Sequence, residues 1–210
     1  MRIALEGRRH IVLAAVATIA AALVAPWPVA AAGVVVTLLL VNFFRDPERA
    51  TPPGDDLVTA PADGKVVAVL DGVEEPRFLK RACRRVSIFM SPLDVHVNRS
   101  PVGGTVIAVE RTAGRFHAAF LDKASELNEQ NAVVVEDARG ERVLFVQIAG
   151  QLARRIVCRV VPGDRLERGE RYGMIMFGSR LDVYLPLGVE IRVKMGDRVT
   201  AGATTLGVYR

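Results

Sequence analysis

The sequence predicts a mainly β domain, an antiparallel sandwich or barrel-like fold, preceded by a helical membrane anchor. Residues 11–44 contain no charged side chain, whereas the chain after Arg45 has an ordinary mixture of charges. Beyond residue 56, short apolar segments alternate with Gly, Pro and Asp at the spacing of hairpins. Two turn motifs, "GDRLERGERYG" at 163–173 and "GDRVTAGATTLG" at 196–207, share one pattern, which is typical of a pseudo-symmetric β fold.

The first predicted element is a membrane segment over residues 1–44. Its uncharged part is too long for one untilted spanning helix and too short for two full spans. The "PWP" at 26–28 lies near the middle, where prolines break a helix and Trp favours the headgroup level. We expect a helical hairpin that dips into one leaflet or just crosses the bilayer, with a single kinked span as the alternative.

Basic residues flank this segment on both sides, which places both of its ends in the cytoplasm under the positive-inside rule. A cleaved signal peptide is disfavoured, because the apolar run is too long and no clean cleavage site follows it. We therefore predict a cell-membrane protein whose folded domain lies on the cytoplasmic side. The flanking residues are Arg2, Arg8, Arg9, Arg45 and Arg49.

A linker, "RDPERATPPGDD" at 45–56, follows, and its prolines keep it extended. The predicted domain covers residues 57–210, and only 118–128 has enough helix formers to suggest a short helix or an ordered loop. The apolar strand "RYGMIMFGSR" at 171–180 ends in a Gly-Ser pair. The other predicted strands are 65–70, 85–90, 104–110, 132–137, 142–148, 155–161, 181–186 and 189–194.

The two Gly-Asp-Arg motifs suit tight turns that enter strands, as in the β modules that hold lipoyl or biotinyl groups. Such carrier modules display a modifiable Lys at a hairpin tip, and neither copy has one there. The repeat therefore predicts architecture rather than function.

The formal net charge is +5, which raises the question of a nucleic-acid partner. The sequence has no basic stripe interleaved with aromatic residues and no helix-turn-helix pattern, so we expect none. Together with the apolar anchor, the basic excess favours an anionic membrane surface as the partner. Cys83 and Cys158 lie far apart and in no metal-like spacing, so we expect two reduced, buried thiols and no metal cofactor.

Two polar segments next to predicted strands hold candidate catalytic residues. "FMSPLDVHVNRSPVGGTV" at 89–106 contains His96, and "APADGKVV" at 60–67 contains Asp63. An Asp can orient a His, and that His can deprotonate a Ser, so these residues and Ser179 form a candidate set. The Gly-x-Ser-x-Gly elbow of common hydrolases is absent. An ordinary turn remains the alternative interpretation of both Pro-x-Asp-Gly and Gly-Ser.

Taken in order, five segments resemble the short, membrane-associated form of phosphatidylserine decarboxylase proenzymes. The resemblance covers essentially the whole chain, and its strongest part is the last segment. It implies a lyase that converts phosphatidylserine to phosphatidylethanolamine and carbon dioxide. The segments are "NFFRDPERATP" at 42–52, "PADGKVV" at 61–67, "FMSPLDVHVNRSPVGG" at 89–104, "NEQNAVVVE" at 128–136 and "RYGMIMFGSRLDVYLP" at 171–186.

The resemblance further implies a zymogen that cuts itself between Gly178 and Ser179. The products are a large chain, 1–178, and a small chain, 179–210, which form a heterodimer; further dimerisation of that heterodimer stays open. Ser179 becomes a covalent pyruvoyl group, whose carbonyl forms a Schiff base with the substrate amine and accepts the electrons released by decarboxylation. No metal is implied.

The same resemblance suggests roles for the polar residues. His96 is the expected base for self-cleavage and the proton donor in decarboxylation, with Asp63 as its orienting partner and Asp94 as a second candidate. Longer bacterial members have a second histidine where this chain has Arg99. Either His96 serves both stages, or Arg99 or His117 takes over a contact such as the lipid phosphate.

Two alternatives predict an intact chain. One is a membrane-tethered serine hydrolase that uses Ser179, His96 and Asp63. The other is a non-enzymatic β-barrel carrier or adaptor, suggested by the repeated turns. A relative that acts on another serine-type lipid or on a soluble amino acid also remains open, because the motifs specify the pyruvoyl chemistry better than the substrate.

Overall fold

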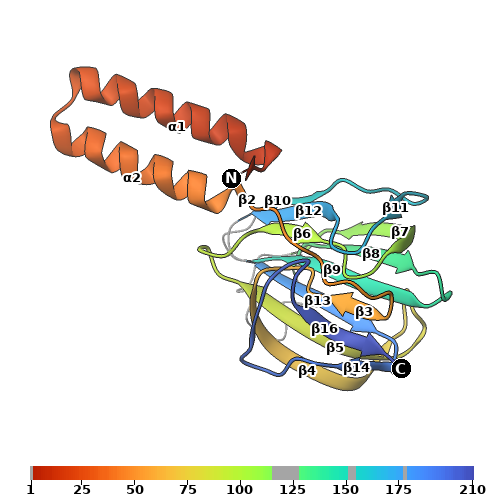
Figure 1. Cartoon of the computed structure of the whole chain (residues 1–210). Coiled ribbons are helices and arrows are strands. Elements are labelled where there is room, and N and C mark those ends of the chain that lie inside the picture. The colour runs from red at the N-terminus through yellow and green to blue at the C-terminus, as the bar shows by residue number, and fades with distance from the viewer. Residues whose placement is uncertain (1, 115–127, 151–154, 177–178) are drawn as a thin grey trace. The chain divides into compact units, whose positions relative to one another are not determined.

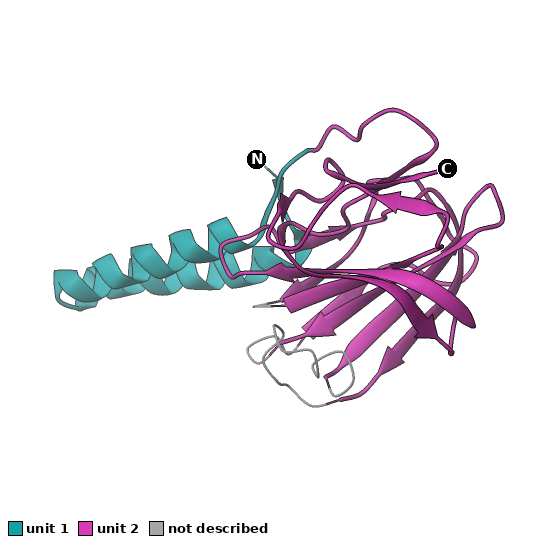
Figure 2. Cartoon of the chain, turned by 90° about the horizontal axis from the view of Figure 1, so that it is seen from below, with its two compact units in different colours: residues 1–48 teal, residues 49–210 magenta. Residues whose placement is uncertain are grey.

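The computed structural model describes residues 2–114, 128–150, 155–176 and 179–210. The chain forms two compact units, Met1–Glu48 and Arg49–Arg210, which Figure 2 distinguishes by colour. The second unit is built from antiparallel strands, and the first contains the apolar helices. The predicted fold class, mainly β with an N-terminal helical segment, is therefore confirmed.

The first unit contains two helices, α1 (Leu5–Val24) and α2 (Trp27–Phe43). Pro26 is the N-cap of α2 and Pro28 lies in its first turn, where a missing backbone N–H is tolerated. Helix α1 is long and apolar enough to cross a membrane, and α2 is apolar but shorter. Two-residue strands pair antiparallel at the helix ends: β1 (Arg2–Ile3) and β2 (Arg45–Asp46).

The two helices approach closely where their side chains are small. Thr18 and Thr37 lie with their hydroxyl oxygens 3.3 Å apart. A Cβ atom at Gly33 would come within 2.7 Å of the Thr18 hydroxyl, so a larger residue there would displace the Thr18 side chain. Most large apolar side chains of both helices are exposed to solvent, which is weakly consistent with membrane association.

The second unit has three antiparallel sheets. The largest curls into a half-barrel with the strand order β11–β7–β8–β9–β13–β5–β4–β15 (Figure 1). Its strands are β4 (Gly64–Glu75), β5 (Arg81–Met90), β7 (Gly104–Thr112), β8 (Gln130–Glu136), β9 (Arg142–Ala149), β11 (Arg165–Leu166), β13 (Ser179–Leu185) and β15 (Arg198–Val199).

The two smaller sheets have three strands each, in the orders β10–β12–β6 and β14–β16–β3. The strands of the first are β6 (Val97–Arg99), β10 (Arg155–Cys158) and β12 (Arg171–Met176). Those of the second are β3 (Leu57–Thr59), β14 (Val189–Ile191) and β16 (Thr205–Tyr209).

Strand β13 lies between two hydrophobic clusters, because successive side chains of a strand point to opposite faces. Leu181 and Val183 belong to the main core, together with residues of the smaller sheets such as Tyr172. Tyr184 packs on the opposite face, against a smaller cluster that includes Cys83 and Leu144. The strand is thus buried on both faces.

The repeated Gly-Asp-Arg turns occupy the two edges of the large sheet. Gly163 donates its N–H to the Val106 carbonyl, and Gly196 donates its own to the Val66 carbonyl, both at 2.8 Å. Both glycines have φ close to +100°. The first turn leads into β11 beside β7, and the second into β15 beside β4. The repeat is therefore architectural, as the sequence predicts.

Every strand predicted from the sequence overlaps a strand of the structure, but two end three residues earlier than predicted. The strand predicted over 155–161 ends at Cys158, and the one over 189–194 ends at Ile191. In both cases the aspartate of the following Gly-Asp-Arg motif accepts a backbone N–H three residues before it, which forms a turn. The short helix or ordered loop predicted over 118–128 lies, apart from Asn128, outside the described residues.

Candidate active site

Ser179 is fully buried at the first position of β13. It pairs with Met90 of β5 on one side and with Ala149 of β9 on the other. Its hydroxyl lies 3.8 Å from the Met90 sulfur. A strand paired on both sides fixes the backbone at this serine. Gly178, the other predicted cleavage residue, lies outside the described residues.

His96 is also fully buried, immediately before β6. Its Nδ1 lies 2.9 Å from the main-chain carbonyl oxygen of Asp94. A carbonyl only accepts, so Nδ1 is the protonated nitrogen in this contact and Nε2 has the lone pair of the neutral ring. The His96 carbonyl accepts the Ile175 N–H at 3.3 Å, which ties this residue to β12.

Ser179 and the segment that contains His96 meet at Met90. The Asn98 amide, two residues after His96, lies 3.7 Å from the same Met90 sulfur that the Ser179 hydroxyl contacts. In addition β12, which precedes Ser179 along the chain, pairs with β6. The pairing of β12 with β6 and of β13 with β5 therefore brings the segments of these two predicted residues close together.

A chain of buried amides extends from this point into the core. Gln147 donates to the Asn98 side chain at 2.9 Å and to the Val157 carbonyl at 3.3 Å, and Asn131 donates to Gln147 at 3.0 Å. Sequence reasoning missed these residues. The available signal is an amide in an otherwise apolar strand, as in "RVLFVQI", because a buried amide requires partners.

The Asp63 carboxylate connects three other segments of the chain. One carboxylate oxygen accepts from the Arg49 guanidinium, and the other accepts the Ala201 N–H, both at 2.8 Å. These contacts join the segment before β3, the turn before β4 and the turn after β15. The orienting role of Asp63 toward His96 stays a prediction.

Asp94 shapes the turn that leads to His96. Its Oδ2 accepts the Ser91 N–H at 2.8 Å and the Ser91 hydroxyl at 2.7 Å, and its Oδ1 accepts from Arg198. Because its carbonyl also binds His96 Nδ1, Asp94 fixes the imidazole through the main chain rather than through its carboxylate in these contacts.

Arg99 is 6% exposed and donates from Nη1 to the Gly169 carbonyl at 2.8 Å. A Cβ atom at Gly202 would come within 2.9 Å of its Cδ, so the two turns that follow β11 and β15 enclose this side chain. His117, the other predicted phosphate contact, lies outside the described residues.

Sequence reasoning also missed a cluster of buried charges next to Ser179. Arg180 and Asp182 form an ion pair on the other face of β13, and the Arg180 guanidinium donates to the Ser87 hydroxyl at 2.9 Å. The sequence signal for such a cluster is a pair of charged residues two positions apart within an apolar strand, because their side chains lie on the same face.

Burial sets the protonation of two tyrosines near this strand. Complete burial raises the pKa of Tyr172 well above its ordinary value, and its ring packs edge-on against Phe145. Burial, followed by the charge of Asp182, raises the pKa of Tyr184, while Arg85 opposes that shift. Both phenols are therefore neutral at physiological pH. Among the described residues, no three His, Cys, Asp or Glu side chains gather as a metal site would require.

Comparison with known proteins identifies the family. The model of the phosphatidylserine decarboxylase family matches residues 36–207. The phosphatidylserine decarboxylase proenzyme of Geotalea uraniireducens is 47% identical over 206 residues, which cover 98% of this chain and 96% of the relative. That of Syntrophus aciditrophicus is 48% identical over 82% of this chain and 81% of the relative. That of Citrifermentans bemidjiense is 51% identical, covering 83% and 78%. This chain therefore belongs to the phosphatidylserine decarboxylase family.

Proposed function

We propose that this enzyme converts phosphatidylserine to phosphatidylethanolamine and carbon dioxide after cutting itself between Gly178 and Ser179. The observation that supports this proposal most directly is the position of Ser179. This buried serine is the first residue of β13, a strand that is paired on both sides, and it lies beside the segment that contains His96. Relatives of matching length are named proenzymes, which supports a maturation step. Family membership favours this function over a serine hydrolase or a non-enzymatic carrier.

In the proposed cut, the Ser179 hydroxyl adds to the Gly178 carbonyl carbon, and the peptide C–N bond breaks to leave an ester. Removal of the Cα proton of residue 179 then expels the Gly178 carboxylate and leaves dehydroalanine. Hydrolysis of that group releases ammonia and leaves a pyruvoyl group at the start of the small chain. We assign His96 as the base for the hydroxyl proton, because its Nε2 has the lone pair in the tautomer described above.

The proposed products, 1–178 and 179–210, stay together as a heterodimer. Strand β13 pairs with β5 through seven residues and with β9 through six, and most of its side chains are buried. The small chain thus remains within the sheet after its covalent link is lost.

The position of Ser179 fits a pyruvoyl group, since this residue is enclosed by strands on both sides and shielded from water. Bound there, the pyruvoyl ketone supplies the electron sink that amino-acid decarboxylation requires. For this stage we assign His96 to return a proton to the substrate carbon. Asp94 holds the imidazole through its carbonyl, while Asp63, Arg99 and His117 remain proposed supporting contacts.

The apolar helix α1 supports membrane association, and a phosphatidylserine headgroup lies at a membrane surface. We propose that the second unit lies on the cytoplasmic side, where anionic lipid attracts the basic protein. An anchored enzyme then meets its lipid substrate within two dimensions.

Denaturing mass spectrometry of the purified protein tests this proposal. We expect two fragments, of which the smaller corresponds to 179–210 with residue 179 as pyruvate and resists Edman degradation. Changing Ser179 to Ala should leave one uncut, inactive chain of 22.8 kDa. The matched control is Ser100→Ala, since Ser100 is another fully buried serine and should still allow cutting. A single full-length species in an active preparation would overturn the proposal.

A further inference from the structure

We propose that the tips of two turns beside Ser179, which present Leu93 and Met195, form a second membrane-docking surface that inserts into an anionic bilayer. This inference rests on the proposed lipid substrate. Leu93 is 67% and Met195 is 73% exposed, more than any other large apolar residue described in the second unit. We name this the Leu93–Met195 surface; it also includes Pro92 and the cations Lys65, Lys194 and Arg198.

Leu93 and Met195 lie on adjacent turns. Leu93 is in the turn 91–94, which Asp94 closes, and Met195 is in the turn 194–197. Arg198, directly after the second turn, forms an ion pair with Asp94 of the first. The two turns are thus joined by a direct contact.

The sheet register places this surface at the Ser179 end of the molecule. Lys65 of β4 pairs both with Arg198 of β15 and with Phe89 of β5. The next residue of β5, Met90, pairs with Ser179. The segment that follows β5 forms the turn 91–94, so Leu93 is three residues beyond Met90, the partner of Ser179.

The charges on this surface suit anionic lipid. Lys65, Lys194 and Arg198 are exposed cations around the two apolar tips. The nearby carboxylates are engaged within the turns: Asp94 binds Ser91 and Arg198, and Asp197 accepts the Lys194 N–H. Apolar side chains surrounded by cations are typical of segments that bind the headgroup region.

The size of the surface favours a bilayer over a protein partner. A stable protein interface buries about 800 Å² per partner around a central apolar cluster. Here the apolar contribution comes from the tips of two turns, which can enter a fluid headgroup layer without a complementary rigid surface. Docking at this point would bring the bilayer to the end of the sheet where Ser179 lies.

Fluorescence quenching tests the insertion without requiring catalysis. The chain has one tryptophan, so the Trp27→Phe variant has no tryptophan fluorescence and serves as the parent for single-tryptophan variants. Leu93→Trp and Met195→Trp probe the surface, and Leu187→Trp is the matched control. Leu187 is 49% exposed and follows the far end of β13 from Ser179. Each full-length protein is reconstituted into vesicles of phosphatidylserine and phosphatidylcholine with brominated acyl chains.

We expect the bromines to quench the indoles at positions 93 and 195 at least about twofold more than the indole at 187, because inserted side chains lie about 5–10 Å into the interface. Equal quenching at all three positions overturns the proposal. Absence of quenching at positions 93 and 195 also overturns it, and a protein is then the remaining candidate partner for this surface. These results do not depend on turnover, so they are distinguishable from failure of the proposed reaction.

A kinetic comparison gives a second readout. For Leu93→Ser combined with Met195→Ser, we expect the ratio of KM for vesicle substrate to KM for dispersed short-chain phosphatidylserine to rise by about tenfold, as loss of a buried apolar side chain predicts. Leu187→Ser should leave that ratio at the parent value. A double variant with the parent ratio contradicts docking through this surface.

Discussion

The Arg180 guanidinium binds the Asp182 carboxylate at two points within β13. Nε donates to Oδ1 at 2.6 Å and Nη2 donates to Oδ2 at 3.1 Å, and the two side chains are 1% and 0% exposed. Ser87 of the neighbouring strand β5 accepts from Nη2 as well. Because side chains alternate along a strand, this pair lies on the face opposite Ser179. It therefore fixes the first residues of β13 from behind the proposed pyruvoyl site.

Changing Asp182 to Asn should destabilise the protein strongly. The variant keeps the shape of the side chain but removes the negative charge that compensates a buried guanidinium. Loss of one partner of a buried pair typically costs about 3–5 kcal/mol. Denaturant unfolding of the full-length protein in detergent measures the change in the free energy of unfolding.

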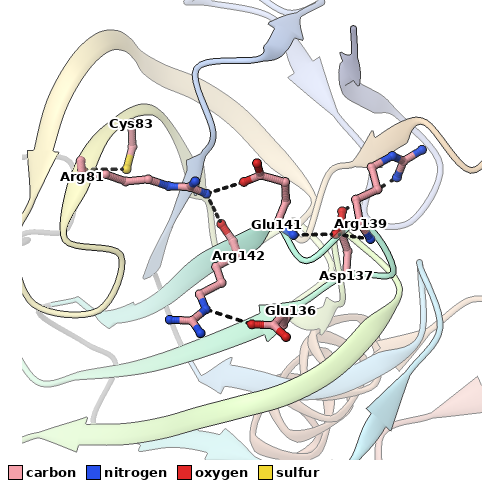
Figure 3. Close-up of polar contacts among 7 residues, drawn as sticks. All are labelled: Arg81, Cys83, Glu136, Asp137, Arg139, Glu141 and Arg142. Carbon is pink, nitrogen blue, oxygen red and sulfur yellow. Dashed lines mark hydrogen bonds and ion pairs between the residues drawn. The ribbon is translucent and has the colours of Figure 1, made fainter.

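The matched control is an exposed ion pair in the same sheet. Arg142 donates to Glu136 at 2.9 Å with side chains 52% and 37% exposed (Figure 3). Glu136→Gln should cost less than about 1 kcal/mol, because solvent screens such pairs. Equal losses in the two variants would contradict a structural role for burial of the Arg180–Asp182 pair.

The longer strands could be predicted from sequence because their side-chain pattern is local. The two-residue strands β11 and β15 could not, because their strand geometry comes from pairing with β7 and β4. Likewise the Gly-Asp-Arg repeat predicted turns in a pseudo-symmetric fold, but only the register shows that these turns form opposite edges of one sheet.

The candidate site was predictable where local motifs exist and not where contacts span the sequence. Ser179 and His96 stand in recognisable segments. In contrast, Gln147 contacts Asn98 from 49 residues away, and such pairing depends on the whole sheet. For the same reason the sequence gives no sign that the Asp63 carboxylate binds Ala201, 138 residues later.

Gly64 and Gly104 occupy equivalent positions at the two edges, and alanine at either should destabilise the fold. A Cβ atom at Gly64 would overlap the Phe89 carbonyl, and one at Gly104 would overlap the Glu136 carbonyl. Neither backbone carbonyl can move freely within its ladder, so we expect losses of about 1–3 kcal/mol in each variant. The free energy of unfolding measures both.

Gly188→Ala provides the control for these variants, because nothing lies within 4 Å of the added Cβ. Its effect should stay within about 0.5 kcal/mol. A large loss at Gly64 with none at Gly104 would show that the two edges are not energetically equivalent, despite their matching geometry.

The two cysteines should differ in reactivity toward a thiol reagent. Cys83 is fully buried, as expected, and donates to the Arg81 carbonyl at 3.2 Å (Figure 3). The expected burial of Cys158 is wrong, because this residue is partly exposed. Burial, the largest effect, raises the pKa of the Cys83 thiol above its ordinary value despite the opposing charge of Arg81. Since the thiolate is the reactive form, Cys158 should be alkylated first at pH 8.

The raised pKa also sets the direction of a pH effect. Because the pKa of Cys83 is higher in the folded protein than in the unfolded chain, the protonated thiol stabilises the folded state. This stabilisation is complete below the unfolded pKa and is lost as pH rises through the folded pKa.

Peptide mapping after timed alkylation identifies which of the two cysteines is modified first. Faster modification of Cys83 than of Cys158 in the folded protein would contradict the burial argument.

Changing His96 to Gln should slow self-cleavage, because glutamine fills a similar space but cannot take the Ser179 proton. General-base catalysis typically contributes about 10²–10⁴-fold, and we expect a rate loss in that range. The rate is followed as conversion of the full-length chain to the 179–210 fragment by mass spectrometry.

His10→Gln is the matched control for this change. The His10 ring also has Nδ1 2.9 Å from a main-chain carbonyl, that of Glu6, but the side chain is exposed on α1. This control should be cut at the parent rate. If His96→Gln is also cut at the parent rate, His96 has no part in the first stage. Decarboxylation by the cut variant then tests the second stage alone, since the pyruvoyl group forms independently of the imidazole in that case.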